Sequence, residues 1–350
     1  MRDITQLTEE ELKNKLNIKQ DYRIKQIYEW LWKKEVDSFD NFSNIPLELR
    51  NHLKEKFYIP KVKVYEINEA KDKTIKIAFE LTDNQIIEGV LIPSSNRVTA
   101  CVSSQVGCNV GCKFCATGKM GFYRNLTIGE IVFQVKKLNI ISEKYFSRKL
   151  TNIVFMGMGE PLLNYKNVKR ASEIITKAEG LGISPRRITL STVGITDKII
   201  QLAKDKVKFN LAVSLHSADE TIRTNLIPIN KQHSLKKLQR AIFYFHKQTG
   251  NRITIEYLLI KGINDKIEDA KKLSIFCKAF PCKINLIEYN TIQGIPFKKP
   301  ENITLKAFKE YLESKNLIVN IRHSKGKDID AACGQLATKI KQKSTRKRNN

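Results

Sequence analysis

The N-terminal segment, MRDITQLTEEEL, lacks an apolar run of the length that a secretory signal or a membrane span requires. We therefore expect a cytoplasmic protein that does not contact a membrane, in a compartment where thiols stay reduced. The cysteines number seven, and an odd count excludes a fully paired disulfide framework. In a reducing compartment, closely spaced cysteines indicate a metal site or catalysis more often than structural bridges.

Acidic residues are scarce relative to basic ones. The chain has 36 Asp and Glu against 62 Lys and Arg, which gives a formal charge of +26. A bias of the coding sequence toward lysine codons would explain the high number of lysines. It would not explain the low number of Asp and Glu residues. The excess favours a polyanionic partner, and nucleic acid before a membrane, because no strongly amphipathic basic helix stands out. Residues 336–350 form a basic tail that is either solvated only or also binds phosphates.

Residues 1–84 are predicted to form a small accessory domain that binds RNA, although most small helical bundles bind none. Thr8 and Glu11 form a capping-box pair ahead of a first helix. Two further helices are marked by apolar residues at helical spacing: Ile24, Ile27, Tyr28 and Leu31, and then Leu49, Leu53 and Phe57 after Pro46. Alternating residues predict connecting strands at 61–67, 74–81 and 85–92.

Residues 85–335 are predicted to form the large α/β core, in line with a length of 350 residues. Apolar runs alternate there with helical stretches such as 128–139 and 233–247. The runs lie at 97–104, 151–158, 186–192, 209–215, 252–260 and 283–290. Six such units predict parallel strands joined by crossover helices, in a closed or partly closed (β/α)6 barrel. A barrel of this kind has its site at the carboxyl ends of the strands.

Cys108, Cys112 and Cys115 follow the first of these strands, with the spacing C-x-x-x-C-x-x-C. Structural zinc prefers four ligands, and only Cys101 is near enough in sequence to be a fourth. A redox pair, Cys112 and Cys115, would leave Cys108 unexplained. A [4Fe–4S] cluster held by three thiolates leaves one iron open to a small molecule, which makes the missing fourth cysteine useful.

Other polar residues end the later strands and converge on the same mouth of the predicted barrel. Glu160, in GMGEP, is placed to accept from an ammonium group, and its neighbouring glycines allow a close approach to a ligand. The remaining strand-end residues are Ser191, Ser214, Leu215, His216 and Asn290. Any one of them alone is more often a satisfied turn residue, and His216 is equally well explained as a structural histidine. Cys277 and Cys282 are interpreted as structural.

The spacing of Cys108, Cys112 and Cys115 resembles the cysteine motif of the radical S-adenosylmethionine (SAM) superfamily. The segments CVSSQVGCNVGCKFCATG, FMGMGEPLLNY, SLHSA and DIDAACGQL, in this order, resemble more narrowly the adenine-C2 ribosomal and transfer RNA methyltransferases of that superfamily. The resemblance covers nearly the whole chain. It implies a radical SAM barrel, a cluster held by Cys108, Cys112 and Cys115, and SAM contacts from Gly159, Glu160, Ser191, Ser214, Leu215, His216 and Asn290.

The resemblance also implies a mechanism with two SAM molecules per turnover. The first methylates Cys333, and the second is cleaved at the cluster to activate that methyl group, which then adds to carbon 2 of adenine. Glu88 is implied as the general base and Cys101 as the residue that resolves the adduct, leaving a Cys101–Cys333 disulfide. The implied partners are 23S rRNA, tRNA and an electron donor such as flavodoxin or ferredoxin, and we expect a monomer.

Two alternatives remain open at this point. The sister family that methylates carbon 8 of adenine and confers antibiotic resistance shares the cluster and both catalytic cysteines. Pro161 and the pattern around GFYRNL favour the carbon 2 family. The second alternative is a non-catalytic, basic RNA-binding protein with a zinc ion bound by Cys101 and the three clustered cysteines.

Overall fold

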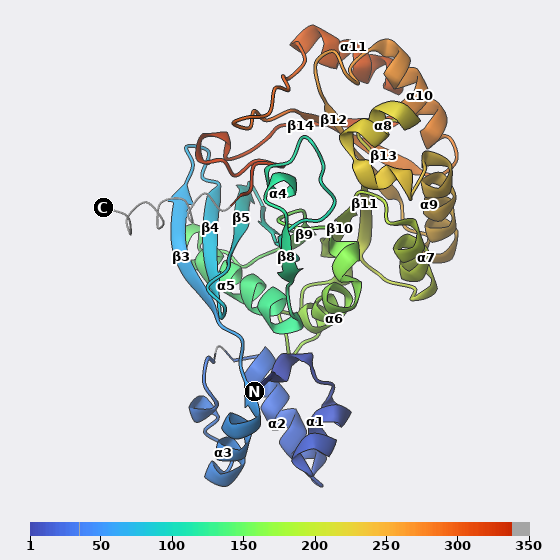
Figure 1. The fold of residues 1–350 in the computed structure, drawn as a ribbon. Coiled ribbons are helices and arrows are strands. Elements are labelled where there is room, and N and C mark those ends of the chain that lie inside the picture. Colours follow the sequence, from blue (N-terminus) through green and yellow to red (C-terminus); the bar gives the residue numbers. More distant parts are fainter. Residues whose placement is uncertain (35, 338–350) are drawn as a thin grey trace.

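The computed structural model describes residues 1–34 and 36–337 (Figure 1). Most of the predicted basic tail therefore lies outside the described residues. Within them, no helix has the length and apolar character needed to cross a membrane.

A small helical unit begins the chain. Its helices are α1 (Glu9–Leu16), α2 (Asp21–Trp32) and α3 (Leu47–Lys56), as the helical spacing predicts. The Thr8–Glu11 capping box is present, since each side chain binds the backbone N–H of the other residue. One detail of the prediction is wrong: α3 ends at Lys56, and Phe57 starts a short strand, β2 (Phe57–Tyr58). This strand pairs with β1 (Arg2–Asp3), because its backbone groups are satisfied better by the chain start than by another helical turn.

The main sheet of the chain has ten strands in the order β14-β13-β12-β11-β10-β9-β6-β5-β4-β3. Strands β6 and β9 to β14 run parallel, whereas β3, β4 and β5 extend the sheet in antiparallel fashion. The strands are β3 (Val62–Glu69), β4 (Ile75–Leu81), β5 (Ile86–Ser94), β6 (Arg97–Cys101), β9 (Asn152–Phe155), β10 (Ile188–Thr192), β11 (Asn210–Ser214), β12 (Ile253–Leu259), β13 (Cys282–Glu288) and β14 (Ile318–Arg322).

All six predicted core strands are present, and the predicted fold class is confirmed: the sheet is an open, partial barrel with edges at β3 and β14. The seventh parallel strand, β14, was missed. Of its residues IVNIR only Val319 is buried, so the segment lacks the continuous apolar run of a strand buried on both faces.

Helices cover the outer side of the curved sheet (Figure 1). They are α5 (Ile128–Phe146), α6 (Tyr165–Thr176), α7 (Thr196–Lys204), α9 (Leu235–Thr249), α10 (Ile267–Cys277) and α11 (Asn302–Glu313). Two shorter helices, α4 (Ala116–Lys119) and α8 (Glu220–Leu226), follow the carboxyl ends of β6 and β11. A two-stranded ribbon of β7 (Gln105–Gly107) and β8 (Phe122–Asn125) frames the loop before α4.

The boundary expected at residue 84 falls between β4 and β5, two strands that are hydrogen-bonded along their length. Strands β3 and β4 thus belong to the large sheet. We propose that the accessory unit ends near Tyr58. It docks on the core at the start of α5, where Gly129 N–H donates to the Thr5 hydroxyl at 3.0 Å.

Candidate active site

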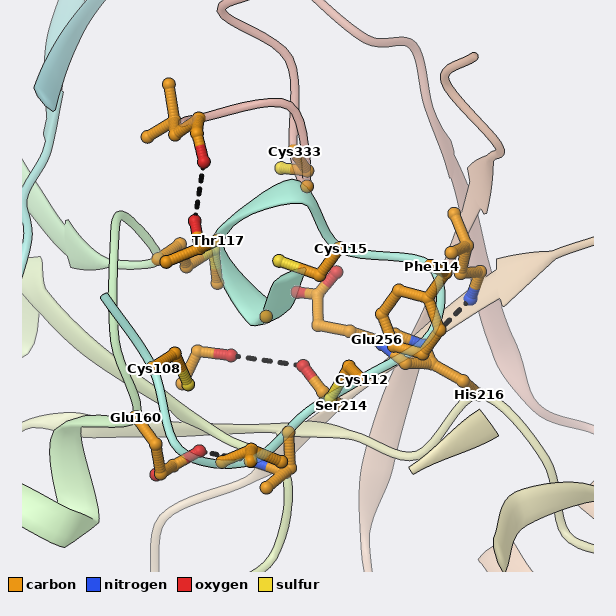
Figure 2. Close-up of a pocket in the computed structure, with 18 of the residues that line it drawn as sticks. Cys108, Cys112, Phe114, Cys115, Thr117, Glu160, Ser214, His216, Glu256 and Cys333 are labelled. Carbon is orange, nitrogen blue, oxygen red and sulfur yellow. Dashed lines mark hydrogen bonds between the residues drawn. The ribbon is translucent and has the colours of Figure 1, made fainter. Parts of the chain in front are cut away.

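A cavity opens at the carboxyl ends of the parallel strands, where the barrel fold predicts a site. Its walls contain the three clustered cysteines, Cys333 and further predicted residues, several of which Figure 2 shows pointing toward one another. The predicted residues among its lining are Cys108, Cys112, Cys115, Gly159, Glu160, Ser191, Ser214, His216, Asn290 and Cys333. The structure therefore brings together ten residues that are spread over the chain from position 108 to position 333.

The cysteine loop is held at its start by the β7–β8 ribbon. Cys108 N–H donates to the Gly121 carbonyl at 2.9 Å. The preceding Gly107 has φ +74°, and a Cβ there would lie 1.9 Å from that same carbonyl oxygen, so only glycine fits. Burial raises the pKa of all three thiols, that of Cys108 to about 12. Thiolates at these positions therefore need a cation, which a metal centre supplies.

The donor set fits an iron–sulfur cluster better than zinc. Cys101 does not line the cavity with the other three cysteines. Among the described residues, no three or more Cys, His, Asp or Glu side chains are arranged to hold a single metal ion. The zinc interpretation, which required Cys101 as a fourth ligand, has no support in this geometry.

Glu160 presents a buried carboxylate beside the cysteine loop. Its two oxygens accept from the backbone N–H groups of Leu162 at 3.0 Å and Val193 at 2.8 Å. Burial raises its pKa to about 7, although these two bonds act in the opposite direction. The preceding Gly159 has φ +97°, and a Cβ there would lie 2.5 Å from the Gln105 side chain. The backbone at this turn therefore requires glycine, and a bound cation would favour the ionised carboxylate.

The strand-end serines and Asn290 supply hydrogen-bonding groups to the wall. The Ser191 and Ser214 hydroxyls lie 3.5 Å apart on neighbouring strands. The Asn290 Nδ2 donates to the Cys333 carbonyl at 3.4 Å, while its buried Oδ1 has no hydrogen-bond partner. A buried amide oxygen left without a partner is a position for a ligand donor.

His216 is a neutral, structurally engaged histidine that also lines the cavity. Its Nδ1 accepts from the Leu258 N–H at 3.0 Å, and its ring meets Phe114 edge-to-face at 4.8 Å. Burial and the nearby Arg223 lower its pKa to about 3. The neighbouring Leu215 is fully buried and does not line the cavity. Its backbone N–H donates to the Glu256 carbonyl at 3.0 Å.

The loop that carries Cys333 lies over α4 and the cysteine loop (Figure 2). Ala116 N–H donates to the Gly334 carbonyl at 2.7 Å, and the Thr117 hydroxyl donates to the Leu336 carbonyl at 2.6 Å. Gln335 connects the loop to the segment after β13: its Nε2 donates to the Thr291 carbonyl at 3.0 Å, and its Oε1 accepts from the Ala332 N–H. Cys333 is exposed at the mouth of the cavity.

Cys101 and Glu88 lie on neighbouring strands and face the same side of the sheet. Cys101 is paired with Val90, two residues from Glu88, and side chains two apart share a face. Cys101 is also paired with Val154, two residues before Met156, which lines the cavity. Cys101 and Glu88 thus lie on the cavity side of the sheet, behind the residues that line the cavity. The implied Cys101–Cys333 disulfide is absent from this structure, since both thiols are free.

Two charged residues of the cavity wall were missed. Glu256 lies on β12 and Arg322 at the end of β14. Glu256 is buried inside a strand whose other residues are mostly apolar, and a carboxylate at such a position is a signal that the sequence does contain. Arg322 stands in a half-exposed edge strand and gives no comparable signal.

A buried arginine behind the wall, Arg223 on α8, was also missed. Its Nε donates to the Leu215 carbonyl at 3.1 Å, and its other nitrogens donate to the Val193 carbonyl and to the Asn230 side chain. Arg223 therefore ties together the segments that follow β10 and β11, the strands that carry Ser191 and Ser214.

This cavity on this partial barrel defines a radical SAM enzyme. The family model for the radical SAM superfamily matches residues 102–273, and that for the ribosomal RNA large subunit methyltransferase N-terminal domain matches residues 2–59. The chain is similar to a crystal structure of a radical SAM methyltransferase from Sphaerobacter thermophilus, with 37% identity and a TM-score of 0.89 over 97% of this chain and 100% of that one.

Curated relatives narrow the class to one family. The chain is 48% identical to a probable dual-specificity RNA methyltransferase RlmN of Flavobacterium psychrophilum, over 97% of this chain and 98% of that protein. It is 46% identical to the protein of the same name in Thermotoga neapolitana, over 91% and 92% of the two chains. The chain belongs to the dual-specificity RNA methyltransferase RlmN family, which confirms the resemblance seen in its motifs.

Replacing Arg223 should destabilise the fold around the wall. Arg223→Met leaves buried carbonyl groups without a donor, so we expect the free energy of unfolding to fall by about 3 kcal/mol. Denaturant unfolding measures the change. Arg240→Met, at an exposed position of α9, is the matched control and should change it by less than about 0.5 kcal/mol. Equal small effects of both variants would contradict a tying role for Arg223.

Replacing Gln335 should loosen the Cys333 loop without touching the cysteine loop. Gln335→Met removes two hydrogen bonds of about 1 kcal/mol each, so we expect the S-methylation of Cys333 that the family resemblance implies to slow about tenfold, while iron and sulfide content stay unchanged. Peptide mass spectrometry and iron analysis provide the two measurements. Gln335→Glu, which keeps the acceptor for Ala332, should be intermediate. Loss of iron in Gln335→Met would show that the loop instead supports the cluster.

Proposed function

We propose that this protein methylates carbon 2 of adenine in 23S rRNA, in the peptidyl-transferase centre, and in tRNA, at the adenosine 3′ of the anticodon. The observation that carries the proposal is the cavity that Cys333 shares with the three clustered cysteines. A methyl-accepting sulfur and a radical source have to face one space, since a methyl group bound to sulfur must meet a radical at contact distance.

Cys108, Cys112 and Cys115 would hold a [4Fe–4S] cluster, and Glu160 and Asn290 would orient SAM beside it. Such a cluster with SAM supplies a methyl group at one stage and a carbon-centred radical at another, so two SAM molecules are used per turnover. Glu160 would accept from the amino group of SAM, because its carboxylate is fixed by two backbone donors and faces the cavity. Ser191 and Ser214 are placed for the polar groups of the same molecule.

Cys333 would accept the methyl group and later carry the RNA. Carbon 2 of adenine lies between two ring nitrogens and has no lone pair, so it cannot attack a methyl sulfonium directly. A protein sulfur that holds the methyl group solves this problem. The exposed position of Cys333, on a loop fastened over α4, supports this role because an RNA base can reach it from outside.

Glu88 and Cys101 would complete the reaction. Glu88 would take the proton from carbon 2, and Lys76 lies beside it, with its Nζ 3.7 Å from a Glu88 oxygen. Cys101 would then attack the Cys333 sulfur and release the methylated base. Both side chains face the cavity side of the sheet, which supports their joint assignment.

The charge of +26 supports RNA as the macromolecular substrate. The target adenosine has to leave its stack to reach Cys333, and loop adenosines do so at low cost. We propose further that residues up to about 59 act as an RNA-binding accessory unit and that the protein works as a monomer. An acidic electron carrier such as flavodoxin or ferredoxin would reduce the cluster, and thiol reductants would reopen the disulfide.

The identity of the methylated nucleoside tests the proposed function. Purified, anaerobically reconstituted protein is incubated with SAM, a reductant and unmodified tRNA or 23S rRNA fragments, and nucleosides are separated by mass spectrometry. We expect 2-methyladenosine. 8-Methyladenosine would instead assign the chain to the carbon 8 activity, and an unmodified RNA with a colourless, iron-free protein would revive the non-catalytic alternative.

Replacing Cys333 and replacing Cys101 should stop the reaction at different stages. Cys333→Ala should stop the reaction before any bond to RNA forms, because no sulfur remains to receive the methyl group. Cys101→Ala should accumulate a covalent protein–RNA species, visible in denaturing gels as a nuclease-sensitive mass shift, because nothing attacks the Cys333 sulfur. The double variant should show no such species. Methylation of RNA by Cys333→Ala would overturn the two-cysteine scheme.

A further inference from the structure

Two consecutive aromatic side chains are exposed beside the mouth of the cavity. Phe122 and Tyr123 begin β8, and 43% and 57% of their surfaces are accessible to solvent. Neither residue lines the cavity, and none of the proposed steps uses them. Large apolar side chains are often exposed singly, whereas neighbouring ones on a short strand indicate a binding surface.

A β-bulge explains why both rings reach solvent. Gly107 of β7 is paired with Phe122, and the preceding Val106 is paired with Arg124. Tyr123 is therefore an extra residue on β8. Side chains that follow each other on a regular strand point to opposite faces, and a bulge breaks this alternation. Gly107, opposite Phe122, has no side chain that could cover the ring.

Arg124 fixes the ribbon to the rest of the protein. Its guanidinium donates to both carboxylate oxygens of Asp83, in the turn between β4 and β5, at 2.7 and 2.9 Å. It also donates to both oxygens of Glu130, at the start of α5, at 2.8 Å each. Paired, charged hydrogen bonds of this kind fix geometry as well as add energy. The two rings thus lie on a strand whose position is set before any ligand binds.

The ribbon is continuous with the rim of the cavity. Thr117 and Gly118, in α4, line the cavity, and the chain reaches Phe122 four residues later. The Gly121 carbonyl accepts from the backbone N–H of Cys108, another lining residue, at 2.9 Å. The exposed rings therefore lie directly beside the space in which the proposed function places the target base.

The charge around the rings suits RNA. Residues 89–129, which include the cysteine loop, α4 and the ribbon, contain no Asp or Glu. Lys113, before α4, and Lys119, its last residue, are both exposed. The Lys119 ammonium donates to the Gly294 carbonyl at 2.6 Å, a neutral group that leaves its positive charge in place. A polyanion that approaches the cavity mouth thus meets positive charge and no carboxylate from this segment.

The size of the aromatic surface favours nucleobases over a protein partner. A stable protein–protein interface buries about 800 Å² on each partner, whereas an aromatic side chain buries about 200 Å². Unpaired bases stack on single rings, and this stacking tolerates any sequence because every base has a π face. Such tolerance suits a protein that acts on two different RNAs.

We propose that Phe122 and Tyr123 form a stacking platform for unpaired nucleotides next to the target adenosine. The inference rests on the proposed function, and it adds an RNA contact at the cavity mouth to the accessory unit. Stacking on the two rings would offset part of the cost of removing the target base from its own stack.

The test measures RNA binding apart from the chemistry, with full-length, cluster-loaded protein and no SAM. Tyr123→Ala and Phe122→Ala each remove one ring, and Tyr123→Trp keeps one. Phe243→Ala removes a ring of similar exposure, 49%, from α9 and is the matched control. The probes are the anticodon stem-loop of an unmodified tRNA and a fully paired RNA duplex of equal length. Fluorescence anisotropy gives the dissociation constants, and iron analysis gives the cluster content.

We expect each alanine variant at the ribbon to weaken stem-loop binding about tenfold and to leave duplex binding unchanged. The dependence of the stem-loop affinity on salt should also stay the same, because a stacked ring neutralises no phosphate. Tyr123→Trp should bind as tightly as the unaltered protein, and Phe243→Ala should match it. Unchanged stem-loop affinity in either ribbon variant, or an equal loss on the duplex, would overturn the platform.

Three further outcomes are also decisive. Weaker binding of flavodoxin with unchanged RNA affinity would assign the rings to an electron donor and refute the proposal. If a variant loses iron as well as RNA affinity, Tyr123→Trp decides: restored stem-loop binding supports stacking, and a persistent loss refutes it. If the unaltered protein makes no methyladenosine, the proposed function fails, and the stem-loop affinities still decide whether the rings bind unpaired RNA.

Discussion

The loss of hydration inside the cavity is the constraint on which the rest of the site depends. Burial raises the pKa of the cluster cysteines, of Cys101, of Glu160 and of Glu256. Under the proposed function, the thiols and Glu160 act as anions when they bind a cluster, bind SAM or act as a nucleophile. Burial alone favours their neutral forms, and a cation beside them, such as the iron of a cluster or the ammonium of SAM, would favour the anions.

The barrel scaffold makes this arrangement possible because strand ends fix side chains that the sequence separates widely. Arg223 holds the segments after β10 and β11 together from behind, and the β7–β8 ribbon fixes the start of the cysteine loop through Gly107. These supports use backbone carbonyls rather than the functional groups themselves. The reacting side chains consequently remain available to ligands, as the partnerless Oδ1 of Asn290 illustrates.

The sequence predicted the strands and the cysteine loop because both rest on local patterns. Parallel buried strands are continuous apolar runs, and the spacing C-x-x-x-C-x-x-C is specific in itself. Residues that act through three-dimensional proximity were not predictable in the same way. Arg322 is an ordinary basic residue in an edge strand, and only the path of β14 brings it to Met156 and Glu256. His216 was ambiguous in sequence, and its Nδ1 bond to Leu258 assigns it a structural part.

In the proposed scheme, Cys333 lies on a loop and Cys101 lies on a β-strand. The scheme requires this difference in mobility between the two cysteines. Cys333 has to meet SAM, a radical and an RNA base in succession, and it lies on an exposed loop held by a few hydrogen bonds. Cys101 has to meet only the Cys333 sulfur, and it lies on a strand paired on both sides. A fixed, buried thiol is protected from reaction with SAM or solvent. In the proposed scheme it becomes reactive only when the loop brings the Cys333 sulfur to it.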